Sequence, residues 1–154
     1  GSYEQFFSNG NIKKKGHFFN GKKSGVWEAY SESGYLLKKI NWVNDKLHGV
    51  YQEFWPNGKI KRKGALNNGE KTGSWEKYTE LGFLVQKENW SGNKKNGMYE
   101  EYGIDGKILK KGQFKNGERS GIWTRFNQAG EEQKKVSFHN NIQIKIPINA
   151  SEEK

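Results

Sequence analysis

The stretch GVWEAYSESGYLLKKINWVNDKLH, residues 25–48, places two short segments rich in aromatic and aliphatic residues on either side of a glycine turn. Residues 25–30 and 35–42 have the length and composition of β-strands, and the Asn, Asp, Ser and Gly residues beside them favour turns. Glycines at such close spacing interrupt any helical apolar period. The stretch therefore predicts a β-hairpin followed by a short link.

The same pattern recurs every 24 residues over six units, which is typical of a repeat protein. Two glycine columns mark the units: Gly25, Gly49, Gly73, Gly97 and Gly121, and Gly10, Gly34, Gly58, Gly82, Gly106 and Gly130. Three apolar columns accompany them: Phe6, Tyr30, Phe54, Tyr78, Tyr102 and Phe126; Ile12, Leu36, Ile60, Leu84 and Ile108, with Glu132 as the exception; and Phe18, Trp42, Leu66, Trp90, Phe114 and Phe138. We therefore predict an all-β fold, an elongated single-layer antiparallel meander of six 24-residue β-hairpin repeats.

We expect residues 1–141 to form this repeat domain, with units that start near residues 1, 25, 49, 73, 97 and 121. In the segment 142–148, isoleucines lie on one side of an extended chain, at Ile142, Ile144, Ile146 and Ile148. This pattern predicts a capping or edge strand, which covers the last unit or crosses the apolar face. Residues 149–154 are predicted to be a disordered tail.

The glycine turns predict how the two strands of a unit pair. Leu81 and Ala129 directly precede a turn glycine, where a two-residue type I′ turn would force them to positive φ. A three-residue type I turn requires only the glycine to be left-handed. We therefore expect residue 31 to pair with residue 35, and the other pairs to follow outward.

In this register Tyr30, Leu36 and Trp42 share one face, which also carries paired charges: Glu28 opposite Lys38, Glu4 opposite Lys14, and Glu100 opposite Lys110. The opposite face carries an aromatic column beside an unbroken lysine column. Its candidate partner-binding residues are Tyr3, Trp27, Tyr51, Trp75, Tyr99 and Trp123, with Lys15, Lys39, Lys63, Lys87, Lys111 and Lys135. Either the aromatic rings only cover the sheet beneath lysine side chains, or the strip binds a partner.

The composition favours an anionic partner, because 27 Lys and Arg against 17 Asp and Glu give a formal charge of +10. The basic cluster KIKRK at residues 59–63 fits the second strand of the third unit better than a localisation signal. Hydrophobic residues make up only 32% of the chain, which predicts a thin core. Six Trp, seven Tyr and nine Phe nevertheless argue against a disordered chain.

The segments NGKKSGVW (20–27), NDKLHGVY (44–51), NGEKTGSW (68–75) and NGERSGIW (116–123) resemble the MORN repeat family, specifically its bacterial variant repeat. The resemblance covers residues 3 to about 141. It implies an elongated single-layer sheet that binds proteins, self-associates or contacts phospholipid headgroups. Bacterial variants resemble antitoxin or immunity proteins, which bind a toxin.

Catalysis is not indicated by the sequence. His17, His48 and His139 occupy different repeat columns, without the spacing of a triad or metal site. The glutamate columns have lysine partners, no phosphate-loop pattern is present, and the chain has no cysteine. We therefore expect neither an enzyme nor a cofactor or metal.

The leading hypothesis is a non-catalytic protein-interaction module of the antitoxin or immunity type, with a homodimer through one face left open. The alternative is a peripheral protein that binds anionic phospholipid headgroups. Single-stranded nucleic acid fits less well, because aromatic rungs ~10 Å apart are too widely spaced for consecutive stacked bases. Cell-wall carbohydrate also fits less well, because the 24-residue period and the NGK links differ from those of carbohydrate-binding repeats. No signal or transmembrane segment is recognised, and we expect that a segment upstream of Gly1 has been removed, so the localisation stays open.

Overall fold

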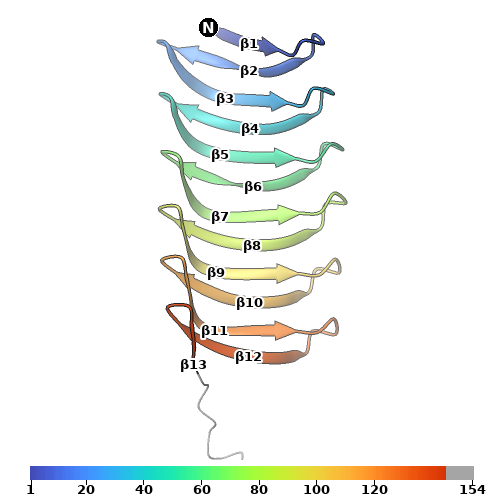
Figure 1. Cartoon of the computed structure of the whole chain (residues 1–154), viewed down its shortest axis with the longest axis vertical. Helices are drawn as coiled ribbons and strands as arrows, with labels where there is room; N and C mark the ends of the chain where they lie inside the picture. The colour runs from blue at the N-terminus through green and yellow to red at the C-terminus, as the bar shows by residue number, and fades with distance from the viewer. Residues whose placement is uncertain (145–154) are drawn as a thin grey trace, which may run out of the picture.

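The computed structural model describes residues 1–144, and it shows one open antiparallel sheet in which every strand pairs with the next strand in the chain. The all-β meander predicted from the sequence is confirmed, with no helix among the described residues (Figure 1). The strands are β1 (Ser2–Phe6), β2 (Ile12–Phe19), β3 (Lys22–Tyr30), β4 (Leu36–Val43), β5 (Lys46–Phe54), β6 (Ile60–Asn67), β7 (Glu70–Tyr78), β8 (Leu84–Ser91), β9 (Lys94–Tyr102), β10 (Ile108–Lys115), β11 (Glu118–Phe126), β12 (Glu132–His139) and β13 (Ile142–Ile144).

Two kinds of turn alternate along the sheet, and Figure 1 shows the glycine turns along one side and the links along the other. In the glycine turn between β3 and β4, the Gly34 amide donates to the Ser31 carbonyl at 3.0 Å, and the Ser31 amide donates to Tyr35 at 2.8 Å. Gly34 has φ of 89°, so the predicted left-handed glycine is confirmed. The next link bends at Asn44 and Asp45, which have φ of 50° and 66°, as in a two-residue type I′ turn.

The predicted strand register is wrong beyond the first pair, because each hairpin contains a β-bulge. Tyr30 pairs with Leu36 as expected, but Ala29 then pairs with Lys38, so one residue of β4 is unpaired. A single extra residue moves all following side chains to the opposite face. The observed pairs are therefore Glu28 with Lys39, Glu4 with Lys15 and Glu100 with Lys111, in place of Lys38, Lys14 and Lys110.

The bulge changes which apolar columns share a face. Trp42 lies on the side of Trp27, opposite to Tyr30 and Leu36, so the expected alignment of all three columns is wrong. We call the side that carries Trp27, Trp75 and Trp123 the tryptophan face. The other side, which carries Glu28, Glu76 and Glu100, is the charge face.

The core lies on the tryptophan face, in three equivalent blocks that are 48 residues apart. In each block a glycine lies between a tyrosine and a tryptophan on the neighbouring strands, and the two rings lie 5.3 Å apart between centroids. The indole covers the glycine so closely that a Cβ atom at Gly64 would lie 2.1 Å from the Trp75 ring. The first block is Tyr3, Gly16 and Trp27; the second is Tyr51, Gly64 and Trp75; the third is Tyr99, Gly112 and Trp123.

The C-terminal edge of the described sheet is β13, which pairs with β12 through His139 and Ile142. This strand falls within the segment 142–148, for which a capping or edge strand was predicted. Residues 145–148, including Ile146 and Ile148, lie outside the described residues, as does the predicted tail 149–154.

Candidate binding surface

The twelve predicted partner-binding residues do not form one strip, because the structure separates them onto two faces. The aromatic column, Tyr3, Trp27, Tyr51, Trp75, Tyr99 and Trp123, lies on the tryptophan face. The lysine column, Lys15, Lys39, Lys63, Lys87, Lys111 and Lys135, lies on the charge face. The predicted pairing of each aromatic residue with a lysine is therefore wrong, and the bulge in every hairpin is the cause.

The tryptophans of the aromatic column form the core of the sheet. Trp27, Trp75 and Trp123 are 4%, 2% and 5% exposed. Each indole N–H donates to a backbone carbonyl of the preceding strand at 3.2 Å. These rings are thus buried and hydrogen-bonded, so the contact surface consists of the side chains that lie above them.

Four of the six lysines in the lysine column pair with glutamates of the same face: Lys15, Lys39, Lys63 and Lys135. Glu28 accepts from Lys15 at 3.0 Å and from Lys39 at 3.2 Å, and the Tyr30 hydroxyl donates to it at 2.5 Å. The arrangement recurs at Glu76, which pairs with Lys63 at 3.2 Å. Most of the lysine column therefore already has anionic partners within the sheet.

The pKa values of the Glu28 and Glu76 carboxyl groups lie below their usual range. Burial alone would raise the pKa of Glu28, but hydrogen bonds from Tyr30, Lys15 and Lys39 lower it to about 2, from 4.5. The pKa of Glu76 shifts in the same direction, because hydrogen bonds from Tyr78 and Lys63 outweigh its burial. A carboxyl group with a lowered folded-state pKa stabilises the fold above its unfolded value, and that contribution is lost on acidification.

We expect the unfolding temperature to fall as the pH is lowered from 4.5 towards 2, the window set by Glu28. Glu28→Gln removes one carboxyl group whose pKa is lowered by folding. The unfolding temperature of this variant is therefore expected to depend less on pH across this window. Thermal unfolding followed by circular dichroism measures the effect, with Glu32→Gln in a glycine turn as the control. Equal pH dependence in the two variants would contradict the assignment.

Sequence reasoning missed the cations that lie over the rings of the tryptophan face. They come from the second residue of four strands, Lys23 in β3, Lys71 in β7, Lys95 in β9 and Arg119 in β11, whereas β5 has Leu47 at this position. The Lys23 ammonium lies 4.9 Å from the Trp27 centroid and 4.5 Å from that of Trp42. The 24-residue spacing of this column is visible in the sequence, but its face follows only from the true register.

The tryptophan face has a large excess of positive charge. By strand position it carries eleven basic residues against three acidic ones. The basic residues are Lys14, Lys23, Lys38, Arg62, Lys71, Lys77, Lys95, Lys110, Arg119, Arg125 and Lys134, and the acidic ones are Glu53, Glu88 and Glu101. All three glutamates pair with cations of their own face: Glu53 with Lys38 and Arg62, Glu88 with Lys95, and Glu101 with Lys110.

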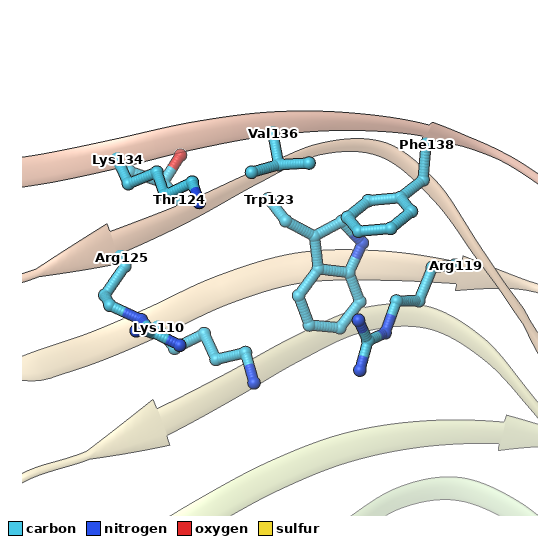
Figure 2. A pocket seen from close by; sticks show the side chains of 8 residues that line it. All are labelled: Lys110, Arg119, Trp123, Thr124, Arg125, Lys134, Val136 and Phe138. Atoms are coloured by element: carbon cyan, nitrogen blue, oxygen red, sulfur yellow. The ribbon is translucent and has the colours of Figure 1, made fainter. Parts of the chain in front are cut away.

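The third block opens into a pocket of about 250 Å³ with cations on both sides of its indole. Figure 2 shows Arg119 beside one side of the Trp123 ring, and Lys110 and Arg125 on the other. Lys134, Val136, Phe138 and Thr124 complete the lining. The site can hold an anion against an apolar wall.

Neither a group of metal ligands nor a membrane-spanning helix is present in the described part of the chain. Among residues 1–144 no three His, Asp or Glu side chains are grouped as for a metal ion. No helix in the same residues has the length and apolarity needed to cross a membrane.

The sequence of two repeat units matches a known repeat family. The model of the MORN repeat variant matches residues 1–20 and 47–68, in two of the repeat units, so the resemblance to that repeat is confirmed there. No curated protein matches the chain. MORN repeats form a non-enzymatic repeat module, and the function class that they indicate for this chain is a repeat-based binding module.

Proposed function

We propose, with these MORN-type repeats as the premise, that the chain is a non-catalytic module that binds an acidic protein partner on its tryptophan face. The difference in charge between the two faces carries the proposal. On the charge face four of the six column lysines pair with glutamates of that face, whereas basic residues far outnumber acidic ones on the tryptophan face. Such a field attracts and orients an acidic surface.

Peripheral binding to anionic phospholipid is the second candidate, and the net charge of +10 favours it. A protein of this kind buries apolar side chains in the membrane beside its cations. In the described strands, however, an exposed apolar column of Val26, Val50, Met98 and Ile122 lies on the charge face. The larger excess of cations and this apolar column are therefore on opposite faces, which supports a protein partner over a membrane.

A narrower form of the proposal is that the partner is an acidic toxin and the chain is its antitoxin or immunity protein. The support is the sequence resemblance to bacterial variant repeats, together with the excess of cations on one face. An immunity protein needs only to cover its toxin, and that requires complementary charge and shape but no catalytic group.

Matched variants of the two faces test the proposal. Lys14, Lys38, Lys110 and Lys134 lie on the tryptophan face, and the next residue in each case, Lys15, Lys39, Lys111 or Lys135, lies on the charge face. Replacing either set by glutamine removes the same charge. A partner captured with the natural chain is purified, identified and titrated by calorimetry against both variants.

We expect the tryptophan-face variant to bind the purified partner about tenfold or more weakly at low salt, and the charge-face variant to bind it nearly as the natural chain does. Equal losses in the two variants would contradict the proposed face. Flotation with phosphatidylserine and phosphatidylcholine vesicles tests the second candidate. Binding to the anionic vesicles alone, without a protein partner, would replace the proposal by that candidate.

A further inference from the structure

The three blocks of the tryptophan face differ in the cations around their indoles. The third block has Arg119 and Arg125 where the first block has Lys23 and Ala29. The only other arginine of the chain is Arg62, so two of the three arginines line one pocket. Arginine binds planar oxyanions through two parallel N–H groups, which lysine cannot do.

The Arg119 guanidinium is held in place by aromatic rings. It lies 5.2 Å from the Trp123 centroid and 5.4 Å from that of Phe138. Within residues 1–144 its guanidinium donates no hydrogen bond to a side chain or carbonyl and forms no ion pair, so its N–H groups are available to a ligand. Arg125 lines the same pocket from the same strand, β11 (Figure 2).

Carboxylates of the described residues do not neutralise Arg119 and Arg125. Arg62 donates to Glu53 at 2.7 Å, but no carboxylate of residues 1–144 lies within 4.0 Å of Arg119, Arg125 or Lys134. The pocket is also larger than its counterpart in the first block, about 250 Å³ against about 70 Å³. Glu28 lines that smaller pocket, although its carboxylate pairs on the charge face.

We infer that the third-block pocket is a carboxylate-binding site, in which the Arg119 guanidinium binds an Asp or Glu side chain of the partner, and Arg125, on the other side of the Trp123 ring (Figure 2), binds a second carboxylate. The inference rests on the proposed function and names the anchor of the acidic partner. Val136 and Phe138 provide the apolar wall against which the methylene groups of that side chain lie. Central aromatic and arginine contacts dominate the energy of most protein interfaces, so a single site of this kind can set the register of the partner.

Nuclear magnetic resonance of the arginine Nε–Hε groups tests the site directly, because the chain has only three arginines. The full chain is titrated with a short oligo-glutamate peptide, and with an oligo-glutamine peptide as the neutral control. We expect the Arg119 and Arg125 signals to move with the first peptide alone. The Arg62 signal, from a guanidinium already bound to Glu53, is expected to stay in place.

Exchanging the residues at positions 119 and 125 of the third block with those at positions 23 and 29 of the first block provides matched variants. Arg119→Lys with Arg125→Ala gives the third block the cations of the first, and should weaken oligo-glutamate binding about 10- to 100-fold. Lys23→Arg with Ala29→Arg makes the reverse exchange, and should raise the number of bound peptides from one to two. Circular dichroism checks that both variants fold. Because Glu152 and Glu153 lie outside the described residues, the titration is repeated with both changed to Gln, and equal or tighter binding is expected.

Other outcomes overturn the inference in distinguishable ways. Equal binding by the Arg119→Lys, Arg125→Ala variant, or equal movement of all three arginine signals, would show that no specific carboxylate site exists. The proposed function would still stand if the purified partner discriminates between the two faces. The carboxylate-site inference would also be overturned if the arginine signals moved with inorganic phosphate or phosphatidylserine vesicles but not with the peptide. The ligand would then be a phosphate.

Discussion

Replacing Trp75 by alanine is expected to lower the free energy of unfolding by about 3–5 kcal/mol. Gly64→Ala is expected to lower it by about 1–3 kcal/mol, because its new Cβ atom would lie 2.1 Å from the Trp75 ring and the ring would have to move. The two residues are the two sides of one contact. In the Trp75→Ala chain the added methyl group meets no ring, so Gly64→Ala should then cost much less.

Urea unfolding followed by circular dichroism measures all four chains of this double-mutant cycle. Val50→Ala is the control, because Val50 is 60% exposed on the charge face, where a substitution usually changes stability by less than about 0.5 kcal/mol. Additive losses for Gly64 and Trp75 would show that the indole does not lie on the glycine. The same cycle is available at Gly16 with Trp27 and at Gly112 with Trp123.

The buried ion pair in the middle of the sheet is expected to be replaceable by apolar residues. Glu88 is 6% exposed and accepts from Lys95 at 3.2 Å, and the corresponding neighbours of the first block are Ile40 and Leu47. Lys95→Leu alone leaves the buried carboxylate without its cation, which should cost about 3–5 kcal/mol, towards the lower end because the lysine is a third exposed. Glu88→Ile with Lys95→Leu should be neutral or stabilising by about 1–4 kcal/mol.

The same denaturation measurement separates the single from the double substitution. The Gln86 amide, which donates to Glu88 at 3.0 Å, stays in all the variants and can turn to solvent in the apolar one. A double variant that is as unstable as Lys95→Leu alone would contradict the expectation. It would show that the second block has packing requirements that the first block does not share.

Much of the fold could be predicted from the sequence because its repeat is uninterrupted. The glycine columns mark the turns, and the pairing of residue 31 with residue 35 is correct, since the glycine turn depends on local backbone geometry. The bulge was not predictable in the same way. The residues at the bulge share no size, charge or turn propensity: Lys13, Leu37, Lys61, Val85, Leu109 and Gln133.

The prediction that the aromatic and lysine columns share one face was wrong for the same reason. A count of alternating positions is reliable only while no residue is inserted, and one insertion moved the lysine column to the other face. A further signal was present in the sequence: Gly16, Gly64 and Gly112 each precede a tryptophan by the same interval, as expected when a large ring lies on a residue without a side chain. That observation would have placed glycine and tryptophan side by side.

Because each Tyr–Gly–Trp block spans two hairpins, the length of this molecule can change without damage only by two hairpins at a time. Deletion of residues 49–72 would remove Tyr51 and Gly64, and Trp75 would then lie between Ile40 and Glu88 with no glycine beneath it. Deletion of residues 49–96 would instead bring Tyr99 to the place of Tyr51, with its own glycine and tryptophan following. Duplication and loss in the ancestry of such chains are therefore expected to have preserved the parity of the hairpin number.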